Sequence, residues 1–137
     1  MKPHRARIIA MQAVFQQEFN KKNFEELSRF VWIDYVIPED ERDYACKIIK
    51  GVLNHTENID KLITIHSKNW KIERISSVSR AILRISIFQI LYMAEELSVK
   101  IIIDEAIKIA KEYGEDDSTR FINGILDAIN RDNIKSK

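Results

Sequence analysis

Apolar side chains recur every three or four residues along most of the chain, which is the spacing of one face of an α-helix. A first helix is expected over residues 4–19, because Pro3 suits a first turn and one face is apolar. That face carries Ile8, Met11, Phe15 and Phe19. A second helix is expected over about 24–34, since Asn23 and Glu26 have the spacing of a capping box. No convincing strand alternation is found, so the pattern predicts an all-α fold.

A third helix is expected to begin after Pro38, where three consecutive acidic residues complement the positive end of the helix dipole. Its apolar stripe continues toward residue 66 and consists of Ala45, Ile48, Ile49, Val52, Ile59 and Ile63. Gly51 is expected to loosen this helix midway. The segment SKNWKIERI, residues 67–75, then breaks the helical pattern.

The most apolar segment of the chain follows at residues 75–96. Between Ala81 and Met93 it is apolar around nearly its whole circumference. A helix of this kind belongs at the centre of a bundle, where every face is covered. Ser98 is then expected to cap a helix that ends at Gly114.

The stretch DSTRFINGILDAIN, residues 117–130, predicts a last helix, but a glycine lies inside it. Gly124 in a helix interior costs roughly 1 kcal/mol relative to alanine. Phe121 lies about 90° from the centre of the apolar stripe, on the same side as Gly124. Phe121 is therefore either a core residue or an exposed contact, and Gly124 can alternatively allow the close approach of a neighbouring helix.

Composition predicts one globular domain over residues 1–137. The chain is 45% hydrophobic and contains three glycines and two prolines, so it can bury a sizeable core. No apolar run approaches the roughly 20 residues that cross a bilayer, and the N-terminus lacks a signal-peptide pattern, which predicts a cytoplasmic protein. Cys46 is the single cysteine, so no intramolecular disulfide can form, and we expect a plain buried thiol.

Charge is unevenly placed although the net charge is only +1. Residues 1–22 contain five basic residues against Glu18, whereas residues 23–43 contain seven acidic residues against two arginines. Such segregation is typical of a basic arm for an anionic partner, and equally of a solvated terminus.

Catalytic chemistry finds little support in the sequence. His4, His55 and His66 lack the spacing of metal ligands, and no nucleophile motif, phosphate-binding glycine loop or dinucleotide fingerprint occurs. We therefore predict a protein that is not an enzyme and has no cofactor, no metal site and no small-molecule substrate.

Four sequence blocks, taken in order, carry a family resemblance. They are RARIIAMQAVF at residues 5–15, GVLNHTENIDKLI at 51–63, SVSRAILRISIFQIL at 77–91, and IIIDEAIKIAKEYG followed by EDDSTRFINGILDAI at 101–129. The last block begins with a helical segment that contains acidic residues followed by alanine (DEA) and continues through a short acidic loop. It ends with a phenylalanine, an Asn-Gly pair and the sequence Ile-Leu-Asp. Together the blocks resemble the NusB family of transcription antitermination factors.

The resemblance implies an all-α fold of two three-helix halves packed across each other, without a catalytic site. It also implies binding of the boxA element of nascent ribosomal RNA together with NusE, a small-subunit ribosomal protein, and joining of RNA polymerase. Carried over by position, the RNA-binding residues would be Lys2, Arg5, Arg7, Gln12, Phe15, Asp117, Ser118, Arg120, Phe121 and Asn123. The N-terminal arm holds fewer arginines than the most basic family members.

Two other functions stay open from the sequence. A similar domain precedes the methyltransferase in some ribosomal RNA cytosine methyltransferases, although 137 residues leave no room for a cofactor-binding sheet. The chain could also be a helical protein-interaction module that does not bind RNA.

Overall fold

The computed structural model describes residues 2–68, 71–115 and 117–135. Its elements are α1 (Pro3–Asn20), α2 (Phe24–Leu27), α3 (Glu39–His66), the 3-10 turn η1 (Ile72–Arg74), α4 (Ser77–Tyr92), α5 (Val99–Tyr113) and α6 (Ser118–Lys135). The described part of the chain contains no strand, which confirms the predicted all-α class. Asn69 and Trp70 of the predicted break, and Asp116 of the acidic loop, lie outside the described residues.

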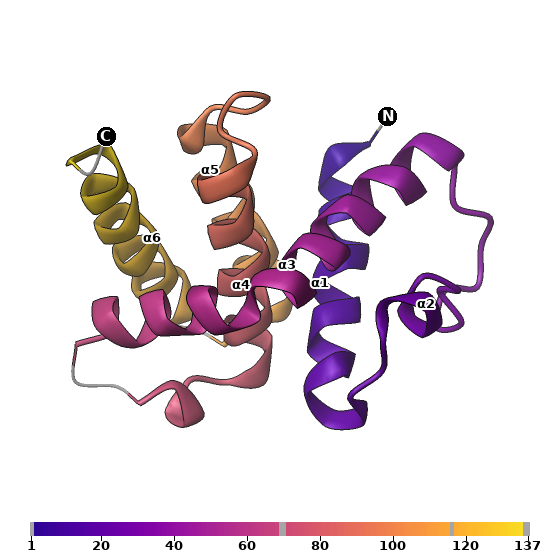
Figure 1. Ribbon diagram of the computed structural model, residues 1–137, viewed down its shortest axis with the longest axis horizontal. Coiled ribbons are helices and arrows are strands. Elements are labelled where there is room, and N and C mark those ends of the chain that lie inside the picture. The colour runs from indigo at the N-terminus through magenta and orange to yellow at the C-terminus, as the bar shows by residue number, and fades with distance from the viewer. Residues whose placement is uncertain (1, 69–70, 116, 136–137) are drawn as a thin grey trace.

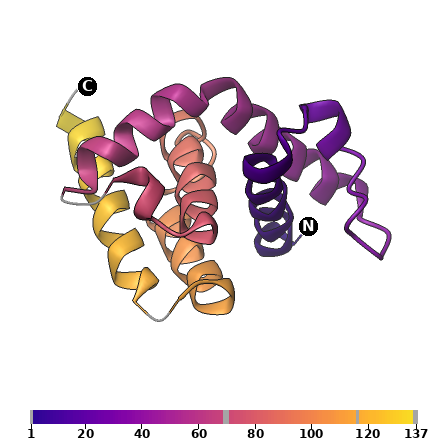
Figure 2. The same ribbon diagram turned by 90° about the horizontal axis from the view of Figure 1, so that it is seen from below.

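The helices form two groups, with α1 to α3 in one and α4 to α6 in the other, as expected (Figure 1). The long helix α3 runs from the α1 side of the molecule to α6, and α5 lies beside α6 (Figure 2). The central helix α4 contacts α1, α3, α5 and α6. No helix in the described ranges is long and apolar enough to cross a membrane.

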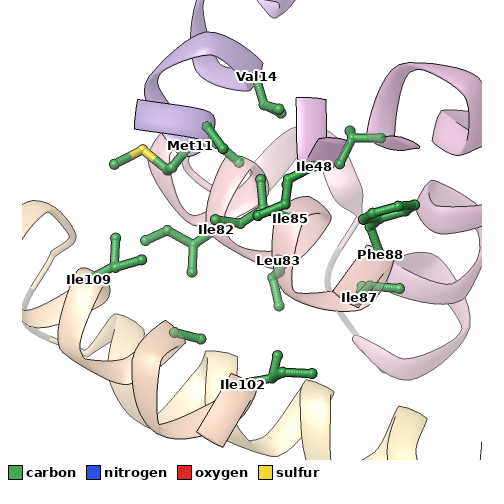
Figure 3. Packing of buried hydrophobic residues seen from close by; sticks show 14 of the residues in the cluster. Met11, Val14, Ile48, Ile82, Leu83, Ile85, Ile87, Phe88, Ile102 and Ile109 are labelled. Carbon is green, nitrogen blue, oxygen red and sulfur yellow. The ribbon is translucent and has the colours of Figure 1, made fainter. Parts of the chain in front are cut away.

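Helix α4 is the centre of the core, as its all-round apolar pattern predicts. Ser76 caps it by accepting a hydrogen bond from the Ser79 amide at 3.2 Å. Every residue from Ile85 to Ile90 is buried. Side chains from three other helices converge on α4 (Figure 3), namely Met11 and Val14 of α1, Ile48 of α3, and Ile102 and Ile109 of α5.

Helix α3 bends at His55 and not at Gly51, so that prediction was wrong. His55 has a non-helical backbone (φ −125°, ψ 16°), and its ring stacks on Tyr92 with centroids 4.3 Å apart. Gly51 instead lies against the Phe88 ring, since a methyl group placed on it would be 2.1 Å from two ring carbons. Glycine at this position therefore permits the close crossing of α3 and α4.

The second helix is a single turn, much shorter than the predicted 24–34. The capping box is present, because the Asn23 side chain accepts from the Glu26 amide at 2.9 Å. The chain then leaves the helix: Phe30 has a positive φ of 50° and is buried, while Trp32 donates a hydrogen bond to Gln12 Oε1 at 3.0 Å. Packing of these two aromatic rings onto the bundle outweighs the helical spacing of residues 27–31.

The predicted start and end of α5 are confirmed. The Ser98 side chain accepts from the Ile101 amide at 3.2 Å and caps α5. Gly114 ends α5 in an extended conformation, and a methyl group there would lie 2.6 Å from the Ser118 hydroxyl oxygen. The glycine thus allows α6 to begin directly against the end of α5.

Candidate nucleic-acid interface

The N-terminal end of α1 carries basic side chains that are largely neutralised within the molecule. Arg5 donates to both carboxylate oxygens of Glu41, with the shortest distance at 2.8 Å, and its guanidinium lies 5.5 Å from the centre of the Tyr35 ring. Hydrogen bonding to Glu41 raises the pKa of Arg5 further. Glu41 itself is buried, and it also accepts from the backbone N–H of Lys2 at 3.2 Å. The Arg5 side chain is still 37% exposed, so the pair with Glu41 does not fully enclose it.

Arg7 does not have the surface position expected of an RNA contact. Its side chain is 3% exposed and donates to Gln89 Oε1 at 3.0 Å and to the Tyr44 hydroxyl at 3.1 Å. Its Nη1 also pairs with Glu105 at 3.3 Å. Arg7 therefore joins α1 to α3, α4 and α5, and a phosphate could reach it only after these contacts broke.

His4 adds a second connection between α1 and α5. Its Nδ1 faces Glu105 and its Nε2 lies 2.7 Å from Glu112 Oε1. Partial burial acts to lower the pKa of His4, but the hydrogen bonds and charges of the two glutamates outweigh it and raise that pKa above 6.5. Protonated His4 thus holds the start of α1 against α5.

Gln12 and Phe15 lie farther along α1 and are half-buried. The Gln12 side-chain oxygen accepts from the Trp32 indole, so Gln12 serves the packing of the segment after α2. Phe15 packs against the core, and its ring lies 5.1 Å from that of Phe19, which is 61% exposed. The structure therefore gives both residues a structural contact in addition to any role in binding.

The start of α6 is a different surface. Asp117 and Arg120 are exposed, whereas Ser118 is buried and its hydroxyl donates to the Glu115 carbonyl at 2.7 Å. Ser118 therefore stabilises the turn into α6. No described carboxylate forms a salt bridge with Arg120, in contrast to Arg5 and Arg7.

Phe121 is half-buried and lies between two clefts. One cleft, of about 430 Å³, we name the acid-edged cleft; it is lined by Arg74, Ile75, Ser76, Ser79, Glu115, Asp117, Ser118 and Phe121. The other, of about 480 Å³, we name the basic cleft; it is lined by His66, Ser67, Lys68, Arg120, Phe121, Gly124, Ile125, Asp127, Ala128 and Arg131. Phe121 packs against the core and also lines both clefts.

Gly124 is exposed, and the interpretation that it allows close approach of another helix was wrong. A methyl group placed on it would meet nothing within 4 Å. Asn123 is half-buried one position before it. The bare backbone beside Phe121 therefore opens into the basic cleft.

The structure groups the predicted residues into two sets. Lys2, Arg5, Arg7, Gln12 and Phe15 lie on α1 or just before it, and Asp117, Ser118, Arg120, Phe121 and Asn123 lie at the start of α6. Sequence reasoning missed the acidic partners Glu41 and Glu105, because nothing local in the sequence pairs residues 36 or 98 positions apart. It also missed Arg131, although its spacing of 11 from Arg120 places both on one face of a helix.

Other candidate chemistry is limited within the described residues. No group of three or more His, Cys, Asp or Glu side chains among them could hold a metal ion. Cys46 is half-buried, and burial raises the pKa of its thiol, which favours the unreactive protonated form.

Comparison with known proteins gives consistent results. The family model described as the NusB family matches residues 4–131. The transcription antitermination protein NusB of Leptospira biflexa is 37% identical over 134 residues, which covers 98% of this chain and 95% of that protein. The relatives carry the name of an antitermination protein and not of an enzyme.

Solved structures agree in fold over nearly the whole chain. T. maritima NusB is 32% identical and superimposes with a TM-score of 0.87 over 96% of this chain and 92% of that one. A chain in the crystal structure of antitermination factors NusB and NusE in complex with dsRNA is 25% identical, with a TM-score of 0.83 over 96% of this chain and 99% of that one.

Proposed function

This chain belongs to the NusB family, and on that premise we propose that it is a transcription antitermination factor. It binds boxA-type single-stranded RNA together with NusE and joins the RNA polymerase elongation complex during ribosomal RNA transcription. Residues 1–137 act as one RNA-binding domain in the cytoplasm, without catalytic activity.

The observation that supports RNA binding most is the position of Phe121 between two clefts at the start of α6. Single-stranded RNA is typically bound by stacking unpaired bases on aromatic rings and by hydrogen bonds to base edges. Asn123 lies two residues after this ring in the sequence and offers an amide group for those edges. One base stacked on Phe121 therefore has partners for both its face and its edge.

Phosphates require cations that are not fully occupied by carboxylates. Lys2 and Arg120 are exposed, and Arg5 remains partly so despite its pair with Glu41. Arg7 serves instead to position α1, because its donors are already used inside the protein. Two or three phosphate contacts are thus available from the predicted residues.

The test is fluorescence anisotropy with a labelled boxA-type RNA, with and without NusE, at several salt concentrations. Two or three contacts give a slope of log affinity against log salt of about −1.5 to −2, at ~0.7 per contact for single strands. A duplex of the same sequence should bind more weakly, because its bases cannot unstack onto Phe121. Binding that strengthens with NusE supports the proposal.

The same measurement separates the other functions. Absence of RNA binding both with and without NusE, by protein that still binds NusE, favours the protein-interaction module. A detached methyltransferase domain finds no support in the named relatives, which match this chain over nearly their full length.

A further inference from the structure

The basic cleft is built along one face of α6. Arg120, Gly124, Asp127 and Arg131 follow one another at spacings of four, three and four residues, so they form a single stripe on the helix. The two arginines are about 16 Å apart along the helix axis. Gly124 and Ala128 lie between the two arginines and have little or no side chain, so the helix backbone forms the floor of the cleft there.

The opposite wall comes from the end of α3 and the residues that follow it. His66 ties the two walls together, since its Nδ1 lies 2.9 Å from the Leu62 carbonyl oxygen and its Nε2 lies 2.6 Å from Asp132 Oδ2 on α6. Lys68 extends this wall and is exposed. The cleft is therefore held in shape by a contact that leaves the arginines uncovered.

Charge distinguishes this cleft from its neighbour. Lys68, Arg120 and Arg131 face a single lining carboxylate, Asp127, whereas the acid-edged cleft has one arginine against two carboxylates. Among the described residues, none of these three cations takes part in a salt bridge. Arg80 and Arg84 elsewhere in the protein are both paired, with Glu18 and Asp60.

We infer that the basic cleft holds the phosphate backbone of RNA nucleotides next to the base stacked on Phe121. The inference rests on the proposed function and extends it, because the RNA footprint then includes Lys68 and Arg131 in addition to the residues predicted from the sequence. The strand passes over the Phe121 ring from one cleft to the other. Phosphates meet the cations of the basic cleft, on the side of the ring away from the carboxylates of the acid-edged cleft.

The experiment compares three labelled single-stranded RNAs: a minimal boxA-type oligonucleotide, and the same oligonucleotide extended by several nucleotides at its 5′ or its 3′ end. Wild-type protein should bind one of the extended RNAs more tightly than the minimal one, with a steeper salt slope by ~0.7 for each added phosphate contact. Arg131→Gln should weaken binding of that extended RNA by about 2- to 10-fold. Its affinity for the minimal RNA should equal that of wild type.

Two control variants make the outcome specific. Arg29→Gln removes the same charge from an exposed position on the segment after α2, and it should change neither affinity. Gly124→Gln should weaken binding of the extended RNA by filling the cleft floor, whereas Gly124→Ala should not, because an added methyl group meets no neighbour.

The two proposals fail in different ways. If wild type binds none of the RNAs either with or without NusE, the proposed function is overturned. If wild type binds all three RNAs with equal affinity and equal salt slope, or if Arg131→Gln and Arg29→Gln weaken every RNA alike, the basic cleft is only a solvated charged face and the inference is overturned.

Discussion

Predicted RNA-binding arginines lie at the starts of both α1 and α6, yet the structure places them in opposite surroundings. At α1, Arg5 and Arg7 are paired with Glu41 and Glu105, and Arg7 is buried. At α6, Arg120 is exposed and forms no salt bridge with a described residue. Residue type and position in a motif therefore do not decide whether a cation is available to a ligand. The long-range carboxylates decide it.

Because the arginines of α1 are paired and Arg120 of α6 is exposed, substitutions at the two places should have different effects on folding stability and on RNA binding. A guanidinium that is desolvated and surrounded by acceptors costs several kcal/mol when it is removed, because its partners stay buried without it. An exposed guanidinium contributes little to folding and keeps its charge for a partner. Truncation should therefore affect folding at α1 and RNA binding at α6.

The largest expected effect is on stability at α1. Arg7→Ala should lower the free energy of unfolding by about 3 kcal/mol or more, because Gln89, Tyr44 and Glu105 lose a buried partner. Arg120→Ala is the matched control and should change it by less than about 0.5 kcal/mol. Urea unfolding measures both. An Arg7→Ala protein that is as stable as wild type but unable to bind RNA would contradict a structural role for Arg7 and would identify it as a phosphate contact.

The next effect is on binding at α6. Phe121→Ala should lose about 1 to 3 kcal/mol of RNA binding, the usual contribution of one base stacked on one aromatic ring. Phe15→Ala should act mainly on stability, since Phe15 packs on the core and on Phe19. The urea midpoint and the RNA dissociation constant should be measured on the same preparation of each variant. A lowered midpoint with unchanged RNA affinity in Phe121→Ala would exclude stacking.

A smaller effect is expected from the charge at the acid-edged cleft. Asp117→Asn should bind RNA more tightly by up to about 1 kcal/mol, because it removes a carboxylate that repels nearby phosphates. Asparagine serves as well as aspartate at a helix start, so folding should not change. Anisotropy at low and high salt measures the gain, which should shrink as salt rises. Weaker binding would show that the carboxylate accepts a hydrogen bond from a base.

The smallest effect is the pH dependence of the His4 contact. The pKa of folded His4 is raised above its unfolded value of 6.5, so its stabilisation is complete below pH 6.5 and disappears as pH rises through the folded pKa. Wild type should be more stable than His4→Gln by up to about 1 kcal/mol at pH 6, and the difference should shrink as pH rises through the folded pKa. Thermal unfolding across this range measures it. A difference that grew with pH would contradict the assignment.

Much of the fold followed from spacing and caps. The boundaries of α1, α4 and α5 were predicted within a few residues because their apolar stripes and capping residues agree with each other. The extent of α2 was not, because burial of Phe30 and Trp32 depends on rings that meet only in the folded bundle. The low helix propensity of glycine predicts a loosening of α3 at Gly51, whereas that glycine packs against Phe88 and the non-helical residue is His55.

The candidate site was predictable in part. Helical geometry placed Phe121 beside Gly124 and off the apolar stripe, and the structure has both residues lining the basic cleft. The neutralisation of Arg5 and Arg7 could not be foreseen, since their acidic partners are distant in sequence. The spacing of Arg120 and Arg131 in the sequence places both on one face of α6. The importance of that face is evident only from the structure, where it lines the basic cleft opposite the end of α3.

Helix α3 connects the two contrasted regions, because one end of it lies at each. Its first turns supply Glu41, which holds Arg5, and its last residue is His66, which forms the wall of the basic cleft. Its 28 residues cover about 42 Å of helical path, with the bend at His55 in between. His55 stacks on Tyr92 of α4 at this bend. One helix therefore contributes to both contrasted regions, so a change in its bend would move the Glu41–Arg5 pair relative to the basic cleft.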